Sequence, residues 1–456
     1  MPDAPVRSRG PFAGLPREVA ILSAVSFTVA LGFGIVSPSI PAFARQFGVS
    51  AAAAASVISA FAFVRILGAL PGGRLVDRFG QRLMIAIGCA VVGVSSILAG
   101  FSGSFVQLIV LRGVGGLGSV LFGIGAQTLL LSSVGPDQRG RASGLYTGGF
   151  LLGGISGPAI GGLIAAWSLR APFFIYGVML AIPAAIAFTA LRDRPRQEED
   201  GPVAEAGGPP AGPASGQVAG QHAGLARTLR NRAYQAAAGA NLADGFAVLG
   251  VRSAIVPLFV KEVLHRSPTV TGIGFGVVAV LNAAMLLPAG RVADKAGRRP
   301  VVVTGCLVSA ASMVVLAFVP GLRGFMIAMV TLGLGSGMLD VAPSAMVGDL
   351  LGNVRGGRGQ GGTGRGAGGT LVAAYQMAGD IGAVTGPVAV GYFVDSISYG
   401  AAFLLAAAVL AAAGVLALTA RETTPRPALT PRGELIEGRP DSSHPACAQR
   451  GGQNHA

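Results

Sequence analysis

The chain has 456 residues, of which 52% are hydrophobic and 12% are charged, and its mean hydropathy is +0.64. A soluble domain carries about a quarter charged residues, so this composition excludes an ordinary soluble protein and indicates one that resides in a lipid bilayer. The formal net charge of +14 would fit either a nucleic-acid or a membrane partner, and the placement of the basic residues decides between the two.

Apolar runs of membrane-spanning length follow one another along most of the chain. A spanning helix needs about 20 apolar residues, and the chain has room for about twelve of them. We expect the first six spans at roughly residues 19–41, 52–72, 83–101, 104–132, 143–166 and 172–191, and the second six at roughly 234–260, 270–289, 300–319, 324–348, 369–393 and 400–420. The first run is too long for a removable signal peptide and lacks a cleavage-site pattern, so we expect a retained helix.

The spans predict a division of the chain into two halves with polar connections. We expect a tail at 1–18, a six-helix bundle at 19–192, a linker at 193–232, a second six-helix bundle at 233–420 and a disordered tail at 421–456. Basic residues such as Arg74, Arg141 and Arg291 gather in every second loop. This pattern places both termini and the linker in the cytoplasm. The positive charge is therefore a topology signal, and we expect no nucleic-acid partner.

One decapeptide occurs twice, each time between two apolar runs. Residues 73–82 (GRLVDRFGQR) recur as residues 290–299 (GRVADKAGRR). The shared pattern rests on Gly73, Arg74, Asp77, Arg78, Gly80 and Arg82 in the first copy and on Gly290, Arg291, Asp294, Gly297 and Arg299 in the second. We expect the glycines at both ends to let the chain reverse tightly. A repeat of this kind indicates a duplicated membrane bundle.

The decapeptide resembles the loop signature of the major facilitator superfamily of secondary transporters. In that family it joins spans 2 and 3 and, more loosely, spans 8 and 9. The resemblance implies an all-α membrane protein with twelve helices in two pseudo-symmetric six-helix bundles around a central cavity. It also implies that Asp77 contacts the N-terminal end of span 11, near Gly369–Leu371, and steadies the outward-facing state.

A second motif lies in the predicted fifth span. Its residues are Gly144, Gly153, Gly157, Pro158, Gly161 and Gly162, and they fit the span-5 motif of the superfamily's drug:proton antiporters. We expect the small residues to let span 5 lie close to its partner in the other half, and the proline to bend the helix. Generic packing of small residues is the alternative, because 72 of the 456 residues are glycine.

A related glycine–proline pattern recurs around Gly382, Gly386 and Gly391. These copies lie farther apart than the two decapeptides do, which indicates an insertion in between. Residues 352–369, rich in glycine and arginine, are the candidate. We expect a flexible cytoplasmic linker there, with binding of RNA or anionic lipid as the alternative.

Ionisable residues inside spans are costly in lipid and therefore mark function. The candidates for proton coupling are Asp244, Asp340, Arg112, Asp380, Arg252 and Arg65. Desolvation disfavours a charged carboxylate, and a nearby arginine or cationic substrate reverses that preference, so a proton and a substrate can compete for one acid. A structural ion pair or an interhelical hydrogen bond is the alternative for each acid. The first span contains no acid, which directs our expectation to the C-terminal half.

In the resembled fold the first helix of each triplet lines the cavity, which places Arg112, Asp244, Arg252 and Asp340 on cavity-lining helices. Arg112 also resembles the arginine of the family's R-x-x-Q-G-x-G motif in span 4, which is implicated in proton transfer. Gly115 stands here at the usual glutamine. Polar and aromatic candidates for the substrate cavity are Phe27, Phe33, Gln127, Asn241, Asn282 and Tyr375.

These features predict a secondary active transporter rather than an enzyme. No nucleophile–base pair, metal-ligand cluster or phosphate loop is visible, so we expect no catalytic residues, no metal and no cofactor beyond the proton gradient. The expected function is proton-coupled efflux of a small amphipathic drug or metabolite, by a monomer in the cell membrane. The alternatives are a proton symporter or facilitator that imports a sugar or metabolite, and a non-transporting membrane sensor or scaffold.

Overall fold

A computed structural model describes residues 14–135, 138–191, 230–356 and 365–422, and no strand occurs among them. Within this part of the chain, twelve helices are long and apolar enough to cross a membrane. Each predicted span coincides with one of these helices, although several helices extend beyond the predicted ends, by up to eight residues. The all-α fold with twelve spanning helices is confirmed. All the described residues belong to one compact unit, residues 1–423.

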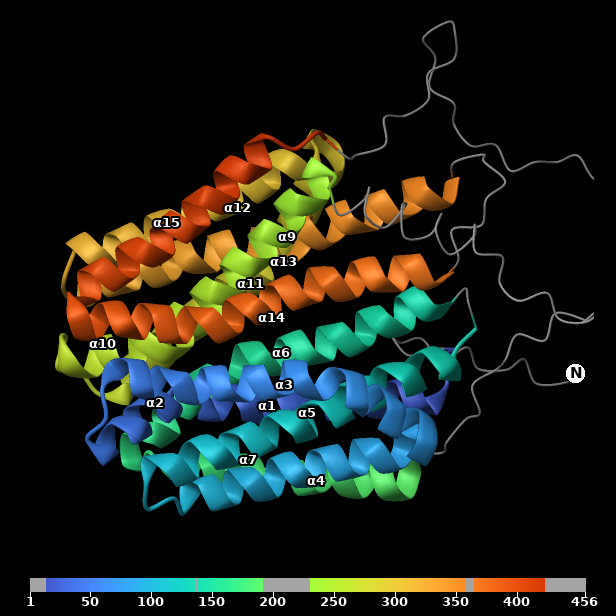
Figure 1. The fold of residues 1–456 in the computed structure, drawn as a ribbon, viewed down its shortest axis with the longest axis horizontal. Helices are drawn as coiled ribbons and strands as arrows, with labels where there is room; N and C mark the ends of the chain where they lie inside the picture. Colours follow the sequence, from blue (N-terminus) through green and yellow to red (C-terminus); the bar gives the residue numbers. More distant parts are fainter. Residues whose placement is uncertain (1–13, 136–137, 192–229, 357–364, 423–456) are drawn as a thin grey trace, which may run out of the picture. The chain divides into compact units, whose positions relative to one another are not determined.

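The helices form two halves of matching order (Figure 1). The N-terminal half contains α1 (Arg17–Val36), α2 (Ser39–Ala44), α3 (Ala51–Phe79), α4 (Gln81–Gly100), α5 (Phe105–Ser133), α6 (Arg139–Trp167) and α7 (Ala171–Ala190). The C-terminal half contains α9 (Arg232–Gly245), η3 (Phe246–Ile255), α10 (Val256–Glu262), α11 (Pro268–Ala296), α12 (Arg298–Phe318), α13 (Leu322–Gly356), α14 (Arg365–Ser396) and α15 (Tyr399–Leu418). Element η3 is a π-helical stretch inside the seventh span.

Glycines bring α1 and α6 into backbone contact. A Cβ atom added to Gly153 would collide with the carbonyl oxygen of Phe27, and one added to Gly161 would collide with that of Ile35. The C-terminal half repeats this arrangement, because a Cβ atom on Gly382 of α14 would collide with the carbonyl oxygen of Leu242 on α9. The two halves thus share the same glycine-lined helix pair, which is the structural form of the sequence repeat.

The span-5 glycines were expected to face the other half, and this expectation is wrong for most of them. Gly153, Gly157 and Gly161 recur every fourth residue and so lie on one face of α6, which packs on α1 of the same half. Gly162 is one position further round the helix and meets Gly272 of α11 in the other half. An added side chain on Gly144 would meet nothing within 4 Å.

The decapeptides do not form glycine-flanked turns as expected. Gly73 and Gly290 lie inside α3 and α11, and the chain reverses only at Gly80 and Gly297, whose φ angles are 87° and 108°. These positive φ values favour glycine.

The last arginine of each decapeptide has the same structural role in both halves. Arg82 donates to the carbonyl oxygen of Phe188 near the end of α7, and Arg299 donates to that of Leu418 at the end of α15. Carbonyls at a helix C-terminus have no partner within the helix, so each arginine satisfies one of them.

Two polar segments are shorter than the sequence predicted. Helix α13 continues to Gly356 and α14 begins at Arg365, so the insertion predicted at 352–369 is helical at both ends, while 357–364 lie outside the described residues. The predicted disordered tail also begins too early. The Glu422 carboxylate accepts hydrogen bonds from the backbone N–H groups of Arg298 at 2.7 Å and Arg299 at 3.2 Å, where the helix dipole of α12 favours an anion.

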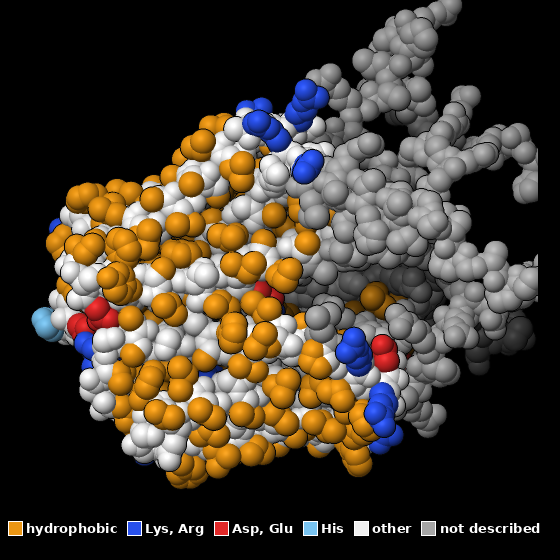
Figure 2. Space-filling view, in the orientation of Figure 1, with side chains coloured by type: hydrophobic (Ala, Val, Ile, Leu, Met, Phe, Trp, Pro, Cys, Tyr) orange, Lys and Arg blue, Asp and Glu red, His pale blue; other side chains and the backbone are white. Residues whose placement is uncertain are grey.

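The two ends of the helices differ in composition. Figure 1 shows α2 and α10 at the same end, which we call the α2/α10 end, and we call the opposite end, with Gly80 and Gly297, the decapeptide end. On the face in Figure 2, apolar side chains cover the flank between the ends, and most of the visible Lys and Arg gather at the decapeptide end. An apolar flank with charged ends is what a bilayer-spanning bundle requires.

The contact of α1 with α6 gives the first prediction. Gly161→Val places a side chain against the α1 backbone, and overpacking of this kind destabilises by about 1–3 kcal/mol. We expect a lower melting temperature of the purified protein in detergent. Gly154→Val is the matched control, because an added Cβ atom there meets nothing within 4 Å. Equal melting temperatures for the two variants would contradict the α1–α6 contact.

Candidate functional site

The seventh, eighth and tenth spans bring charged groups together inside the C-terminal half. Asp244 lies at the end of α9, Arg252 lies in η3, and Asp340 lies on α13. The Nδ2 atom of Asn282, on α11, donates to Oδ2 of Asp340 at 2.7 Å and to Oγ of Ser336 at 3.0 Å. The π-helical backbone that carries Arg252 is rare and is often found at functional sites.

We call Asp244, Arg252 and Asp340 the acid cluster, because electrostatic interactions connect all three. Tyr375 of α14 also interacts electrostatically with both carboxylates. Asp340 is exposed and Asp244 is half-buried. Among the described residues, none forms a hydrogen bond or an ion pair within 4 Å with Asp244. The cluster therefore contains two carboxylates, one guanidinium and an acid without a fixed partner.

Arg112 is buried inside the N-terminal half, away from the acid cluster. It is 2% exposed, and its guanidinium carbon lies 4.8 Å from the centroid of the Phe61 ring, which in turn lies 5.7 Å from that of Phe33. Its Nε atom has no hydrogen-bond partner within the described part of the chain. A Cβ atom on Gly115 would lie 2.9 Å from Oγ of Ser95 and 3.7 Å from the Phe61 ring. A side chain at position 115 would therefore crowd Ser95 and contact the Phe61 ring.

Arg65 and Asp380 bind each other instead of joining the acid cluster. The Nη2 atom of Arg65 on α3 lies 3.0 Å from Oδ1 of Asp380 on α14, so the pair connects the two halves. Nearby, Oγ of Ser59 donates to the carbonyl oxygen of Val384 at 2.7 Å. For Asp380, the structure favours the alternative of an ion pair over a free acid.

The remaining candidates divide between the two halves. Asn282 and the Tyr375 side chain lie at the acid cluster, and Phe33 lies beside Phe61. Asn241 turns away, since its Nδ2 donates to the backbone carbonyl of Tyr375 at 2.8 Å. Gln127 is exposed, and Phe27 is half-buried beside Gly153.

The decapeptide acids have different surroundings. Asp294 binds Arg298 at 2.5 Å within its own half, and Arg298 also binds Asp349 at 3.2 Å. Asp77 is exposed, and the predicted contact of Asp77 falls on the first turns of α14, where the side chains before Leu371 lie outside the described residues. That contact stays a prediction.

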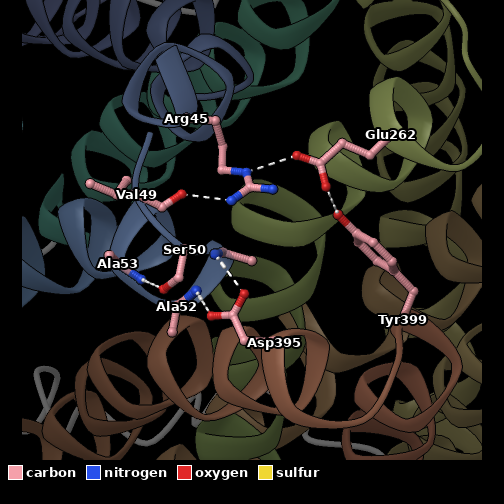
Figure 3. Close-up of polar contacts among 9 residues, drawn as sticks. Arg45, Val49, Ser50, Ala52, Ala53, Glu262, Asp395 and Tyr399 are labelled. Atoms are coloured by element: carbon pink, nitrogen blue, oxygen red, sulfur yellow. Dashed lines mark hydrogen bonds and ion pairs between the residues drawn. The ribbon is translucent and has the colours of Figure 1, made fainter. Parts of the chain in front are cut away.

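A polar network that sequence reasoning missed joins the halves at the α2/α10 end (Figure 3). Nε of Arg45 lies 2.8 Å from Oε1 of Glu262, and the hydroxyl of Tyr399 donates to Oε2 of the same carboxylate at 2.6 Å. Arg45 also donates to the carbonyl oxygen of Val49 at 2.6 Å. Glu262 of α10 is thus held between a residue of each half.

The second part of this network is a helix cap supplied by the other half. The two carboxylate oxygens of Asp395, near the end of α14, accept hydrogen bonds from the N–H groups of Ala51 and Ala52 at 2.8 Å each. Those N–H groups begin α3, where the helix dipole favours an anion. The backbones also touch here, because a Cβ atom on Gly391 would lie 2.6 Å from Cα of Ala52. The α2/α10 end is therefore closed between the halves.

A duplicated bundle of twelve membrane-spanning helices, with charged groups held within the spans, defines a transporter of the alternating two-domain class. The sequence matches the family model of the Major Facilitator Superfamily over residues 22–251 and 237–445. The chain belongs to this superfamily.

Two curated relatives have names that describe drug resistance. Multidrug resistance protein 1 of Bacillus subtilis (strain 168) is 29% identical over 182 residues, which are 40% of this chain and 47% of that protein. The quinolone resistance protein NorA of Staphylococcus aureus (strain Mu50 / ATCC 700699) is 27% identical over 192 residues, which are 41% of this chain and 48% of that protein. The chain spans about half the length of the curated relatives that it matches.

Solved structures share the fold at low identity. A bacterial homologue of the human lysosomal transporter Spinster, in an inward-facing and occupied conformation, has a TM-score of 0.69 at 14% identity, over 88% of this chain and 95% of that chain. The human organic anion transporter MFSD10 (TETRAN) has a TM-score of 0.61 at 15% identity, over 88% of this chain and 100% of that chain. These similarities support the two-bundle architecture.

The network at the α2/α10 end gives the second prediction. Asp395→Asn removes the negative charge at the start of α3 and one of the two acceptor oxygens that bind Ala51 and Ala52. We expect a loss of about 1–2 kcal/mol, which shifts the equilibrium between the closed and the open form of this end by about tenfold. We expect a longer component in the distance between spin labels at Gln46 and Arg266, two exposed positions on opposite halves, with the native cysteines replaced. Glu422→Gln is the control, since it removes a cap within one half. An unchanged distance in the Asp395 variant would contradict a closing role.

Proposed function

We propose that the chain exports small, positively charged amphipathic compounds in exchange for protons. The observation that carries this proposal is the acid cluster, in which Asp244 lies next to Asp340 and Arg252 without a hydrogen bond or ion pair to any described residue. The names of the two curated relatives support the export of drugs or drug-like compounds.

The charges of the cluster suggest the substrate class. With both carboxylates ionised, Asp244, Asp340 and Arg252 carry one net negative charge. One proton or one singly charged cation neutralises it, and the free energy gained by either binding event is larger inside a lipid-embedded bundle than in water. The cluster does not hold the proton and the cation together as readily as it holds either one alone, so binding of one favours release of the other. Competition of this kind is the minimum required for antiport.

Antiport also requires alternating access. The gathering of Lys and Arg at the decapeptide end supports a cytoplasmic position for that end, by the positive-inside rule. The closed α2/α10 end then seals the outer side, so the acid cluster communicates with the cytoplasm. Protonation from the outside would follow once the halves rock, the outer network separates and the decapeptide end closes.

The coupling role of the cluster gives the third prediction. Asp244→Asn holds the position permanently neutral, so a proton gradient can no longer drive substrate movement. We expect export of a cationic dye by reconstituted vesicles to fall to the level of vesicles without protein, with normal expression and membrane insertion.

Asp380→Asn is the matched control for this experiment, because Asp380 is also an acid within a span but is already paired with Arg65. We expect this variant to transport more slowly and to keep its dependence on the proton gradient. Gradient-driven export by the Asp244 variant at the parent rate would remove Asp244 from the mechanism.

A further inference from the structure

The two carboxylates of the acid cluster differ in their hydrogen bonding. Asp340 accepts a hydrogen bond of 2.7 Å from Nδ2 of Asn282, whereas Asp244 accepts none from the described residues. An N–H donor stabilises the ionised form of a carboxylate and gives no comparable help to a protonated one. Two neighbouring carboxylates also disfavour double ionisation, so a single proton goes to the acid with the poorer support. That acid is Asp244.

The amide of Asn282 is itself held in place. Its Nδ2 also donates to Oγ of Ser336 at 3.0 Å, and Ser336 and Asp340 lie four residues apart on α13, so they share one helix face. Asn282 is 9% exposed on the neighbouring helix α11. Both N–H groups of the amide are therefore directed at α13, one at the hydroxyl and one at the carboxylate. This geometry aims a donor at Asp340 whichever way the acid cluster is charged.

The other groups near Asp244 do not replace this donor. Arg252 follows it on the same span and interacts electrostatically with both acids. From the elements packed around it, Tyr375 of α14 and Cys306 of α12 interact electrostatically with Asp244, and neither donates a hydrogen bond to it. The guanidinium of Arg252 lies 5.9 Å from the centroid of the Phe275 ring, which places it against an apolar surface. Among the described residues, Asn282 is thus the group that hydrogen-bonds one of the two acids and not the other.

We propose that Asn282 is a positioning residue whose hydrogen bond keeps Asp340 ionised, so that Asp244 is the acid that takes up and releases the transported proton. The inference rests on the proposed function and assigns separate roles within it. Asp340 then retains its negative charge through the cycle and balances Arg252. The proton leaves the Asp244 carboxyl group to water, and the carboxylate left behind attracts the substrate cation.

The experiment uses infrared difference spectra of the purified full-length protein, recorded while the pH is raised from acidic to alkaline. A carboxyl group that loses its proton loses its C=O stretching band, and we follow the band that the acid cluster contributes. We expect one such band in the parent protein, its absence in Asp244→Asn and its retention in Asp340→Asn. A band that survives in the Asp244 variant and disappears in the Asp340 variant would reverse the assignment and overturn the proposal.

The role of Asn282 is tested by a signal that changes only if its hydrogen bond affects the protonation of Asp340. Asn282→Leu keeps the side-chain volume and removes the donor, so Asp340 begins to take up protons and a second band appears. The double variant Asn282→Leu with Asp244→Asn regains a band that Asp244→Asn alone lacks. If the double variant shows no C=O band, Asn282 does not hold Asp340 ionised, and the proposal fails.

Two further variants complete the design. Asn241→Leu is the matched control, because its amide donates to a backbone carbonyl and not to an acid, and its spectrum keeps the single parental band. Ser336→Ala frees one N–H of Asn282, and we expect a weaker second band from it; this variant serves if Asn282→Leu does not fold. These outcomes are independent of transport: a reversed assignment leaves proton-driven export by the parent protein intact, whereas failure of the proposed function appears as no gradient-driven export by the parent protein.

Discussion

Ionised side chains inside a lipid-embedded bundle must be neutralised or stay close to water, and this constraint accounts for most of the polar structure of the chain. Arg65 and Asp380 neutralise each other across the halves at 3.0 Å. Arg112 is an exception, because it is 2% exposed, lies over the ring of Phe61 and has no hydrogen-bond partner for its Nε atom in the described part of the chain. The acid cluster is different, because its two carboxylates outnumber its one guanidinium. A proton or a cation that binds and is released can correct an imbalance of one charge, and for this reason we propose the acid cluster as the transport site.

The contacts around this site are of two kinds: those within each half hold it rigid, and those between the halves can separate. Within each half, glycine-lined helix pairs such as α1 with α6 bring backbones together, and such close contacts let each half move as one body. Between the halves at the α2/α10 end, the contacts instead include a carboxylate on a helix N-terminus and an ion pair that involves Glu262. Polar contacts of this type exchange readily with water once they open, which suits a gate that closes and opens in every cycle.

The sequence predicted the features that depend on composition and on the spacing of apolar and small residues. It missed the contacts between segments that lie far apart in the chain. Apolar length placed all twelve spans, and the position of Asp244 and Asp340 within apolar runs was enough to mark them as candidate functional residues. The partner of most of the span-5 glycines was assigned to the wrong half, and only Gly162 meets the other half. The repeat of small residues defines a face of α6 but not the helix that covers it. Asp395 was missed, because nothing local distinguishes an aspartate at a helix end from one that caps a helix more than 300 residues earlier. Asn282 was recognised as polar and within a span, but its direction toward Asp340 needed the relative placement of α11 and α13.

The exchange of a proton for a cation at the acid cluster is tested most directly by counting protons on ligand binding. Purified protein in a weakly buffered detergent solution would be mixed with tetraphenylphosphonium, a lipophilic cation that carries no proton of its own, while the pH is recorded. The account predicts an acidification by the parent protein, with about one proton released per cation bound, and none by Asp244→Asn. Binding by the parent without any acidification, no binding by the parent at all, or the same acidification by the variant would contradict it.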